Sequence, residues 1–262
     1  MRLYLALAAL RRVLVPLALG AVAGWTGPLF ASTLIVGAQV HDGSGGPART
    51  VAVRVDADRI VAVGALRARP GERVIPARGL VLAPGFIDAH SHHDRGDYAD
   101  RTMAPLLAQG VTTIVIGQDG EADAPTAQIA SRFAARPAAV NVATYTGHGF
   151  LRDRVLGADY RRLATPAEVA AMQALLAADL KAGSLGLSTG LEYDPGIYAS
   201  HDEVLSLART AAAVGGRYIS HMRNEDTAID AAIDELIDIG AKTGMPVQIS
   251  HLKLGLVDRW GQ

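Results

Sequence analysis

The pattern of hydrophobic and polar positions divides the chain into two parts. From Thr33 to about Ala83, short β-branched runs are interrupted by Gly, Pro and Asp, as in TLIVGAQVHDGSG and TVAVRVDADRIVAVG. Such runs predict small antiparallel strands joined by tight turns, with one corner at Asp42-Gly43. We therefore expect a small β domain over residues 32–83.

From residue 84 onwards, apolar runs rich in β-branched residues alternate with Ala-rich stretches typical of helices. Residues 165–168 and 200–203 are capping-box sequences, and Gly244 is placed to end a helix over residues 231–243. Repeated βα units favour an α/β fold of the (β/α)8 TIM-type barrel class, with the active site at the C-terminal ends of the strands. We predict six strands, at residues 85–90, 112–117, 139–147, 184–191, 217–222 and 246–252.

The first 31 residues differ from the rest in composition, because they are apolar and carry only three charges, all of them Arg. The run from Val13 to Ala23 has about the length of a signal-peptide core and is too short to span a bilayer comfortably. We predict a signal peptide over residues 1–31, export to the periplasm, and no stable membrane association after cleavage. The alternative is an uncleaved membrane anchor that includes residues 3–10.

Composition excludes several classes of site. The formal net charge is -1, with acidic and basic residues interspersed, so nothing favours nucleic acid or an anionic membrane as a partner. A small molecule is therefore the expected ligand. The chain has no cysteine, which excludes disulfides, thiolate zinc sites and a cysteine nucleophile. A metal ion would have to be held by His, Asp, Glu or a modified Lys.

Histidines gather at the ends of the predicted strands. The segment PGFIDAHSHHD, residues 84–94, contains three of the chain's eight histidines. His90 and His92 are two positions apart, so their side chains emerge on the same face of the strand, as two ligands of one metal ion require. The fifth and sixth strands end in ISHMR and ISHLK, which contain His221 and His251. Four histidines at one barrel mouth predict a metal centre, with enough ligands for two ions if a carboxylate bridges them.

Other polar residues follow the same strand ends. Asp119, in IVIGQDG, is the best-placed bridging ligand, although Asp before Gly is also common in turns. Glu192, in STGLEYDPG, is the reserve candidate, and His148, in TGHGF, is predicted to contact the substrate or an oxyanion. Arg223 and Lys253 each lie two residues beyond a histidine, where they are predicted to bind a substrate carboxylate. For His148, Arg223 and Lys253 the alternative is a structural role.

Taken together, these segments resemble a known family. The blocks LAPGFIDAHSHHD, GVTTIVIGQDG, GHGFLR, GLSTGLEYDPGIYAS, YISHMRNE and ISHLKLG follow one another as in the amidohydrolase superfamily. The Ser-Thr-Gly-Leu block and the two His-x-Arg/Lys strands narrow the resemblance, over residues 33–262, to the N-acyl-D-amino-acid deacylases (D-aminoacylases). It implies metal-dependent hydrolysis of the amide bond of N-acyl-D-amino acids by a metal-activated water, giving a carboxylate and a D-amino acid.

The resemblance also implies roles for single residues. His221 and His251 would hold one tightly bound Zn²⁺, and His90 and His92 would face a second, weaker divalent site. Some members of the family have a cysteine at the position of Asp119. Because oxygen ligands are harder than sulfur, the aspartate would favour other divalent ions or a more fully occupied pair of sites.

Members of this family have two more barrel strands, with a catalytic Asp at the end of the eighth, and then complete the β-sandwich begun by the N-terminal region. We therefore predict that residues 84–262 form an amidohydrolase barrel truncated after about six strands, and that residues 32–83 form half of a sandwich. The general-base Asp is expected beyond residue 262. The chain as given is accordingly predicted to be an inactive N-terminal fragment.

Two other functions are compatible with the same residues. Metal ligands serve any scissile amide, so a cyclic amidase, or a dipeptidase acting on isoaspartyl or D-containing peptides, is an alternative within the superfamily. A non-catalytic, exported metal-binding protein is the alternative from another class. An aldolase-like barrel with a Schiff-base lysine is disfavoured, because Lys253 lies two residues from a predicted metal ligand.

Overall fold

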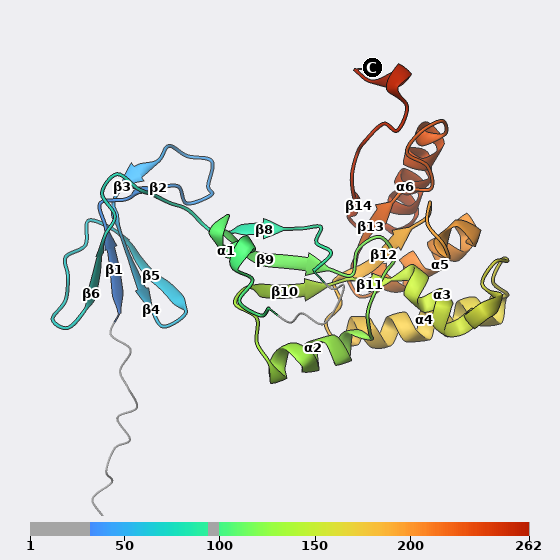
Figure 1. The fold of residues 1–262 in the computed structure, drawn as a ribbon, viewed down its shortest axis with the longest axis horizontal. Coiled ribbons are helices and arrows are strands. Elements are labelled where there is room, and N and C mark those ends of the chain that lie inside the picture. The colour runs from blue at the N-terminus through green and yellow to red at the C-terminus, as the bar shows by residue number, and fades with distance from the viewer. Residues whose placement is uncertain (1–31, 94–99, 262) are drawn as a thin grey trace, which may run out of the picture. The chain divides into compact units, whose positions relative to one another are not determined.

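The computed structural model describes residues 32–93 and 100–261, and the predicted signal peptide lies outside these residues. The chain divides into two compact units, one ending at Pro84 and the other beginning at Gly85 (Figure 1). Each unit has a hydrophobic core of its own. Among the described residues, no helix is both long and apolar enough to cross a membrane.

Within residues 32–84, the first unit has seven short strands: β1 (Thr33–Val36), β2 (Gln39–Val40), β3 (Arg49–Thr50), β4 (Ala52–Asp56), β5 (Arg59–Gly64), β6 (Arg73–Pro76) and β7 (Val81–Leu82). They form two small sheets, in the orders β5-β4-β1-β6 and β3-β2-β7. The pairs β1–β4, β4–β5 and β2–β3 are antiparallel as predicted, but β1–β6 and β2–β7 are parallel. The prediction is wrong for these two pairs because the strands between them in sequence supply the crossover that a parallel pair needs.

A buried ion pair lies in the first unit. Nε of Arg54 donates to Oε1 of Glu72 at 2.6 Å, and Nη2 donates to Oε2 at 3.0 Å. Ser32 donates a further hydrogen bond to the same carboxylate at 2.7 Å. The hydrogen bonds from Arg54 outweigh the effect of burial and lower the pKa of Glu72 to about 2. The carboxylate is therefore ionised throughout the neutral range, as a paired buried charge should be.

The second unit contains seven strands among its described residues: β8 (Phe86–Asp88), β9 (Val111–Ile116), β10 (Asn141–Thr144), β11 (Thr146–Gly147), β12 (Gly186–Gly190), β13 (Arg217–His221) and β14 (Val247–Ile249). They form two sheets, in the orders β10-β9-β8 and β11-β12-β13-β14, and their pairings are parallel. Each of the six predicted strands is found close to its expected bounds. The third divides at Tyr145 into β10 and β11, so that it contributes one piece to each sheet.

Helices connect these strands. They are α1 (Ala104–Ala108), α2 (Thr126–Ala135), α3 (His148–Leu156), α4 (Pro166–Lys181), α5 (His201–Ala212) and α6 (Ile229–Thr243), with 3-10 turns at Gly157–Asp159, Gly196–Tyr198 and Val257–Arg259. The predicted capping box of α4 is present, because the side chains of Thr165 and Glu168 each accept from the other's backbone N–H. At α5 only half of the predicted capping box forms, because the Ser200 side chain accepts from the Glu203 N–H without a reciprocal bond. Helix α6 ends at Gly244 in a left-handed conformation, as expected.

The main core of the second unit lies between helices and the β11–β14 sheet. Helices α3 and α5 pack against β12, and α6 packs against β14 (Figure 1). The interior is filled by buried apolar residues, among them Met172, Leu176, Leu187, Leu207 and Ile239. A second core, which includes Ile114 and Ile116, lies against β9. Because the strands are parallel, their carboxyl ends and the polar residues that follow them lie at the same edge.

Candidate metal centre

Two histidines follow β8 and face one carboxylate. The Nε2 atoms of His90 and His92 lie 3.2 Å apart, and Oδ2 of Asp119 lies 3.4 Å and 3.1 Å from them, respectively. His93 turns away from them and hydrogen-bonds with Ser91. The predicted H-x-H pair is therefore brought together with the predicted bridging residue.

The loop after β9 presents Asp119 in a constrained conformation. Asp119 has a φ of 55°, a left-handed conformation that is uncommon for a residue other than glycine. Ser188, on β12, donates to the Gly117 carbonyl and accepts from the Gly120 N–H. A Cβ at Gly190 would overlap the carbonyl oxygen of Asp119. The Ser-Thr-Gly segment of β12 thus fixes the position of the carboxylate.

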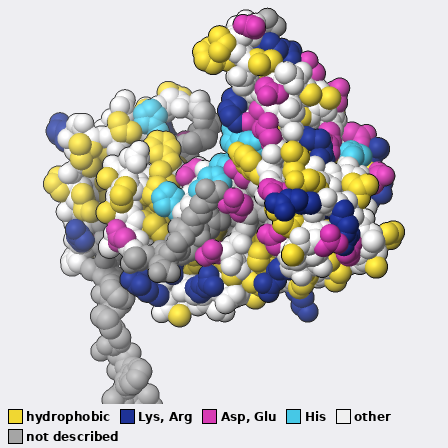
Figure 2. Space-filling model, turned by 45° about the vertical axis from the view of Figure 1, so that its right-hand side comes forward, with side chains coloured by type: hydrophobic (Ala, Val, Ile, Leu, Met, Phe, Trp, Pro, Cys, Tyr) yellow, Lys and Arg dark blue, Asp and Glu magenta, His cyan; other side chains and the backbone are white. Residues whose placement is uncertain are grey.

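The second pair of histidines lies on the other side of Asp119. Nδ1 of His221, at the end of β13, is 3.2 Å from Nε2 of His251, which follows β14. Oδ1 of Asp119 lies 3.8 Å from the same Nε2. Asp119 therefore directs one oxygen towards each histidine pair, as a bridging ligand would. On the face that Figure 2 shows, histidine side chains lie beside acidic ones. We call His90, His92, Asp119, His221 and His251 the His–Asp cluster.

Two glutamates bind the outer nitrogens of the second pair. Oε2 of Glu192 lies 2.9 Å from Nε2 of His221, and Oε1 of Glu225 lies 2.7 Å from Nδ1 of His251. The reserve candidate Glu192 thus lies next to the cluster, but behind His221. Glu225 is not among the residues predicted from the sequence. The signal that could have found it is a carboxylate four residues after a strand-end histidine, in YISHMRNE.

The donor set fits divalent metal ions. Each neutral imidazole of the second pair donates the N–H of its outer nitrogen to a glutamate. The inner nitrogens, Nδ1 of His221 and Nε2 of His251, then carry lone pairs that face each other at 3.2 Å. Two facing lone pairs repel each other unless a cation lies between them. Two nitrogens bound tetrahedrally to one zinc are about 3.3 Å apart. Oδ1 of Asp119 is buried and has no hydrogen-bond partner among the described residues. Nitrogen and oxygen ligands of this kind suit Zn²⁺ and other divalent ions.

The electrostatics favour the metal-binding forms of Asp119 and His221. Burial alone would raise the pKa of Asp119, but the hydrogen bond from His90 and the charges of His90, His251 and His92 outweigh it and lower the pKa to about 2. Burial lowers the pKa of His221, despite its hydrogen bond with Glu192. The carboxylate is therefore ionised and His221 is neutral near pH 7, as metal binding requires.

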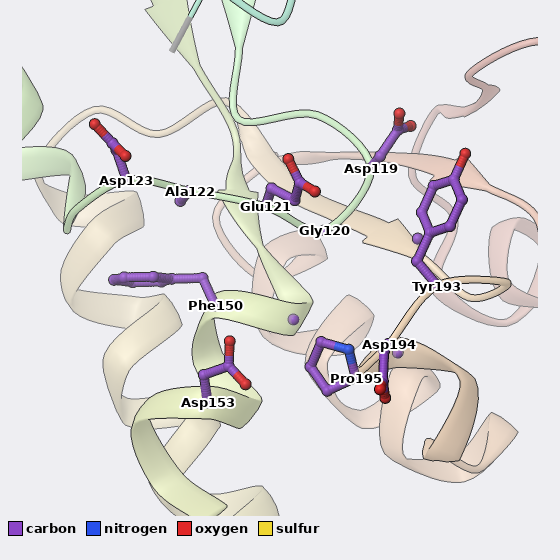
Figure 3. A pocket seen from close by; sticks show the side chains of 13 residues that line it. Asp119, Gly120, Glu121, Ala122, Asp123, Phe150, Asp153, Tyr193, Asp194 and Pro195 are labelled. Carbon is purple, nitrogen blue, oxygen red and sulfur yellow. The ribbon is translucent and has the colours of Figure 1, made fainter. Parts of the chain in front are cut away.

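A cavity of about 290 Å³ adjoins the cluster at Asp119 (Figure 3). The ring of Tyr193 lies against that of His221, with centroids 4.1 Å apart, and Phe150 lies on the opposite side of the cavity. The cavity has an acidic lining that the sequence does not predict, because its residues come from the loop after β9, from helix α3 and from the loop after β12. They are Asp119, Glu121, Asp123, Asp153 and Asp194.

Lys253 is the predicted substrate-binding residue that lies beside the cluster. Its side chain is 56% exposed and forms an ion pair with Glu225. The ammonium is 3.5 Å from Nδ1 of His251. It is therefore next to a predicted metal ligand and open to solvent, as a residue that binds a substrate carboxylate should be.

Two other predicted substrate-binding residues do not reach the cluster. His148 is fully buried at the first turn of α3, where its Nε2 lies 2.8 Å from Glu203. Arg223 donates from Nε and Nη2 to Glu235 on α6, both at 2.8 Å. The substrate-binding prediction is not supported for either residue. The physical reason is that β11 ends at Gly147 and β13 at His221, so neither residue keeps the strand's orientation.

Comparisons with known proteins agree with this geometry. Two curated relatives, both from Alcaligenes xylosoxydans xylosoxydans, are a D-aminoacylase, 38% identical over 244 residues, and an N-acyl-D-aspartate deacylase, 41% identical over 251 residues. These matches cover 84% and 87% of this chain, and 50% of each relative. The chain thus spans about half the length of the curated relatives it matches.

A solved structure supports the same relationship. The N-acyl-D-glutamate deacylase from Bordetella bronchiseptica, solved with zinc and a phosphonate inhibitor, superposes with a TM-score of 0.84 at 35% identity. The superposition covers 87% of this chain and 53% of that chain. The amidohydrolase family model matches residues 73–262, which include all of the His–Asp cluster. On its sequence, its α/β fold and these matches, the chain belongs to the amidohydrolase family.

Proposed function

We propose that the protein hydrolyses the amide bond of N-acyl-D-amino acids, giving a carboxylate and a D-amino acid, and that it requires zinc. The observation that carries the proposal is the placement of Asp119 between two histidine pairs, in a chain 38% to 41% identical to deacylases of this class. The relative solved with zinc supports the choice of metal.

The residues of this chain would hold and orient the reacting groups. His221 and His251 would hold one ion, His90 and His92 a second, and Asp119 would bridge them. A bound divalent ion would supply Lewis acidity towards the acyl carbonyl and the attacking water.

The two metal sites would differ in affinity. The outer nitrogens of His221 and His251 are both bound by glutamates, whereas Nδ1 of His90 and Nδ1 of His92 are buried without a partner among the described residues. Carboxylates behind metal-binding histidines fix the ring orientation and increase ligand basicity. This difference supports a tight site at the second pair and a weaker site at the first.

Lys253 would bind the substrate carboxylate, since its ammonium is exposed beside the cluster. The substrate would then lie with its carboxylate at Lys253 and its acyl carbonyl near Asp119. We propose that the general base is an Asp at the end of a further strand of a (β/α)8 barrel. That strand would belong to the part of the fold that the relatives contain and this chain does not span. The parallel pairings within the β10-β9-β8 sheet and within the β11-β12-β13-β14 sheet support that architecture.

We also propose that the protein is exported to the periplasm and has no stable membrane association after cleavage. The apolar, arginine-containing segment over residues 1–31 supports this location. Sequencing the N-terminus of the protein recovered from a periplasmic extract tests it. A mature chain that begins near residue 32 agrees with export, and a chain that retains Met1 in the membrane fraction contradicts it.

The function is tested by assaying the complete gene product on N-acetyl-D- and N-acetyl-L-amino acids, before and after removal of metal by a chelator. The expected result is hydrolysis of the D-substrates that is lost on chelation and restored by Zn²⁺. Hydrolysis of hydantoins or isoaspartyl dipeptides instead would favour the alternative amidohydrolase activities. Bound metal without hydrolysis of any of these amides would favour a non-catalytic metal-binding protein.

A further inference from the structure

The carboxylate of Glu225 lies close to both histidines of the second pair and to the residue proposed to bind the substrate, with Oε2 3.6 Å from Nε2 of His221. Its side chain is only 5% exposed. Oε1 lies 2.7 Å from Nδ1 of His251, a proposed metal ligand, and Oε2 forms an ion pair with the ammonium of Lys253. One buried carboxylate is thus shared between the metal centre and the residue proposed to bind the substrate.

The loop after β13 holds Glu225 in place from both sides. The Asn224 side chain accepts hydrogen bonds from the backbone N–H groups of Asp226 and Ala228, at 3.1 Å and 2.6 Å. The Gly255 N–H donates to the Glu225 carbonyl at 2.7 Å, which ties the loop to the segment that carries His251 and Lys253. The position of the carboxylate is therefore set by the backbone of two segments.

We propose that Glu225 is a positioning residue that couples the metal centre to substrate recognition. Its hydrogen bond occupies Nδ1 of His251, so that Nε2 of the ring is the nitrogen directed at the cluster, and its charge holds Lys253 beside that ring. This inference rests on the function proposed above, and it adds a residue through which metal binding and recognition of the substrate carboxylate depend on each other.

Glu225 is also one of three residues that could themselves form a metal site, together with Glu192 and His221. The ammonium of Lys253 already neutralises the Glu225 carboxylate, so a further cation at this position would be repelled. Within residues 32–93 and 100–261, no cation pairs with Glu192 in this way, and its side chain is 34% exposed. A positioning role for Glu225 therefore accounts for its contacts better than direct metal binding.

Two substitutions separate the two parts of the proposal. Glu225→Gln keeps an oxygen that can accept from His251 but removes the charge that holds Lys253. We expect it to raise KM for an N-acetyl-D-amino acid but not for the corresponding carboxamide. Glu225→Met is similar in shape but has no comparable acceptor, and we expect it to weaken zinc retention against a chelator by about 10- to 100-fold.

Controls distinguish positioning from a general loss of structure. Glu168→Gln changes a glutamate in the capping box of α4, which also pairs with an arginine but takes no part in the cluster. Zinc retention, KM and the visible spectrum of the cobalt-substituted protein should all match the wild type in this variant. Circular dichroism of each metal-free variant reports folding, and Glu225→Gln decides the test if Glu225→Met does not fold.

The outcomes separate this proposal from the proposed function. Weaker zinc retention in Glu225→Met, with a KM change confined to the free acid in Glu225→Gln, supports it. Wild-type zinc retention and an unchanged ratio of KM values for acid and amide overturn it, while the deacylase function stands. A third equivalent of zinc that is lost in Glu225→Gln also overturns it, in favour of direct metal binding. A wild-type protein that binds no metal overturns the proposed function itself.

Discussion

Asp119 and His251 follow strands of different sheets, yet Oδ1 of the aspartate lies 3.8 Å from Nε2 of the histidine. The contact joins the β8–β10 sheet to the β11–β14 sheet at the edge where their strands end. Because Oδ2 of the same carboxylate faces His90 and His92, the aspartate contacts three of the four histidines, and it forms a group with His221 and His251 whose ligand atoms lie within 4.8 Å of one another. Asp119 is therefore the residue on which the proposed metal centre depends most.

Replacing Asp119 by asparagine removes the charge while keeping the size of the side chain. We expect zinc retention against a chelator to fall by at least about tenfold. Removing a residue that hydrogen-bonds to a metal ligand typically weakens metal affinity by this much, and removing a ligand itself should weaken it no less. Metal content after dialysis against increasing chelator measures the effect. Asp58→Asn is the matched control, since that side chain is 83% exposed in the first unit and should leave zinc retention unchanged.

Replacing Asp119 by cysteine changes the softness of the bridge. A thiolate should shift the preference of the centre towards zinc and away from manganese, because soft ligands favour softer ions. Competition between the two metals, measured on the wild type and on Asp119→Cys, checks the direction. An unchanged preference would show that the side chain at position 119 does not determine which metal the centre prefers.

Adding one methyl group at Gly190 should displace Asp119. In Gly190→Ala the new Cβ would overlap the Asp119 carbonyl oxygen, so the loop after β9 must move. We expect a loss of about 1–3 kcal/mol of stability, typical of overpacking, together with weaker zinc retention. Urea unfolding and chelator titration measure the two effects. Gly46→Ala, which meets only the Ser44 side chain at 3.4 Å, should change neither.

The buried group around Glu203 should matter for stability and not for metal binding. Nη1 of Arg152 donates to Oε2 of Glu203 at 2.6 Å, and His148 lies against the other oxygen. Glu203→Ala leaves the buried guanidinium without its counterion, which should cost about 3–5 kcal/mol. Denaturant unfolding measures that loss. The zinc content of the folded variant should equal that of the wild type. A loss of zinc without a loss of stability would instead indicate that His148 contributes to the metal site.

The ion pair between Arg54 and Glu72 should make the first unit sensitive to acid. The folded pKa of Glu72 is about 2, below the ordinary value of 4.5, so the pair stabilises the unit above about pH 4.5, and this contribution is lost as pH falls towards 2. Hydrogen exchange of the backbone amides in β1, β4 and β6 reports on this unit alone. Glu72→Gln should flatten the pH dependence between 4.5 and 2, and an equally steep dependence in this variant would assign it to other groups.

The strand-end histidines could be predicted from the sequence because two simple rules place them. The two-residue spacing predicts that His90 and His92 lie together, and they do, although β8 ends at Asp88 before reaching them. Parallel strands bring His221 and His251 to the same edge. Neither rule requires knowledge of side-chain packing. The same is true of Asp119, whose position directly after β9 is sufficient.

Other features depend on contacts that no local pattern contains. Arg223 was assigned to the substrate because it lies two residues beyond His221, but β13 ends at that histidine and the chain then turns towards Glu235. The role proposed for Glu225 depends on a loop held by Asn224. The parallel pairing of β1 with β6 depends on a partner far away in sequence.

Anomalous X-ray diffraction at the zinc edge, on crystals of the complete protein grown with zinc, tests most directly whether Asp119 bridges two metal sites. We expect one peak between the facing nitrogens of His221 and His251, and a weaker peak between those of His90 and His92, both in contact with Asp119. A single peak among Glu192, His221 and Glu225, or no peak near Asp119, would contradict it.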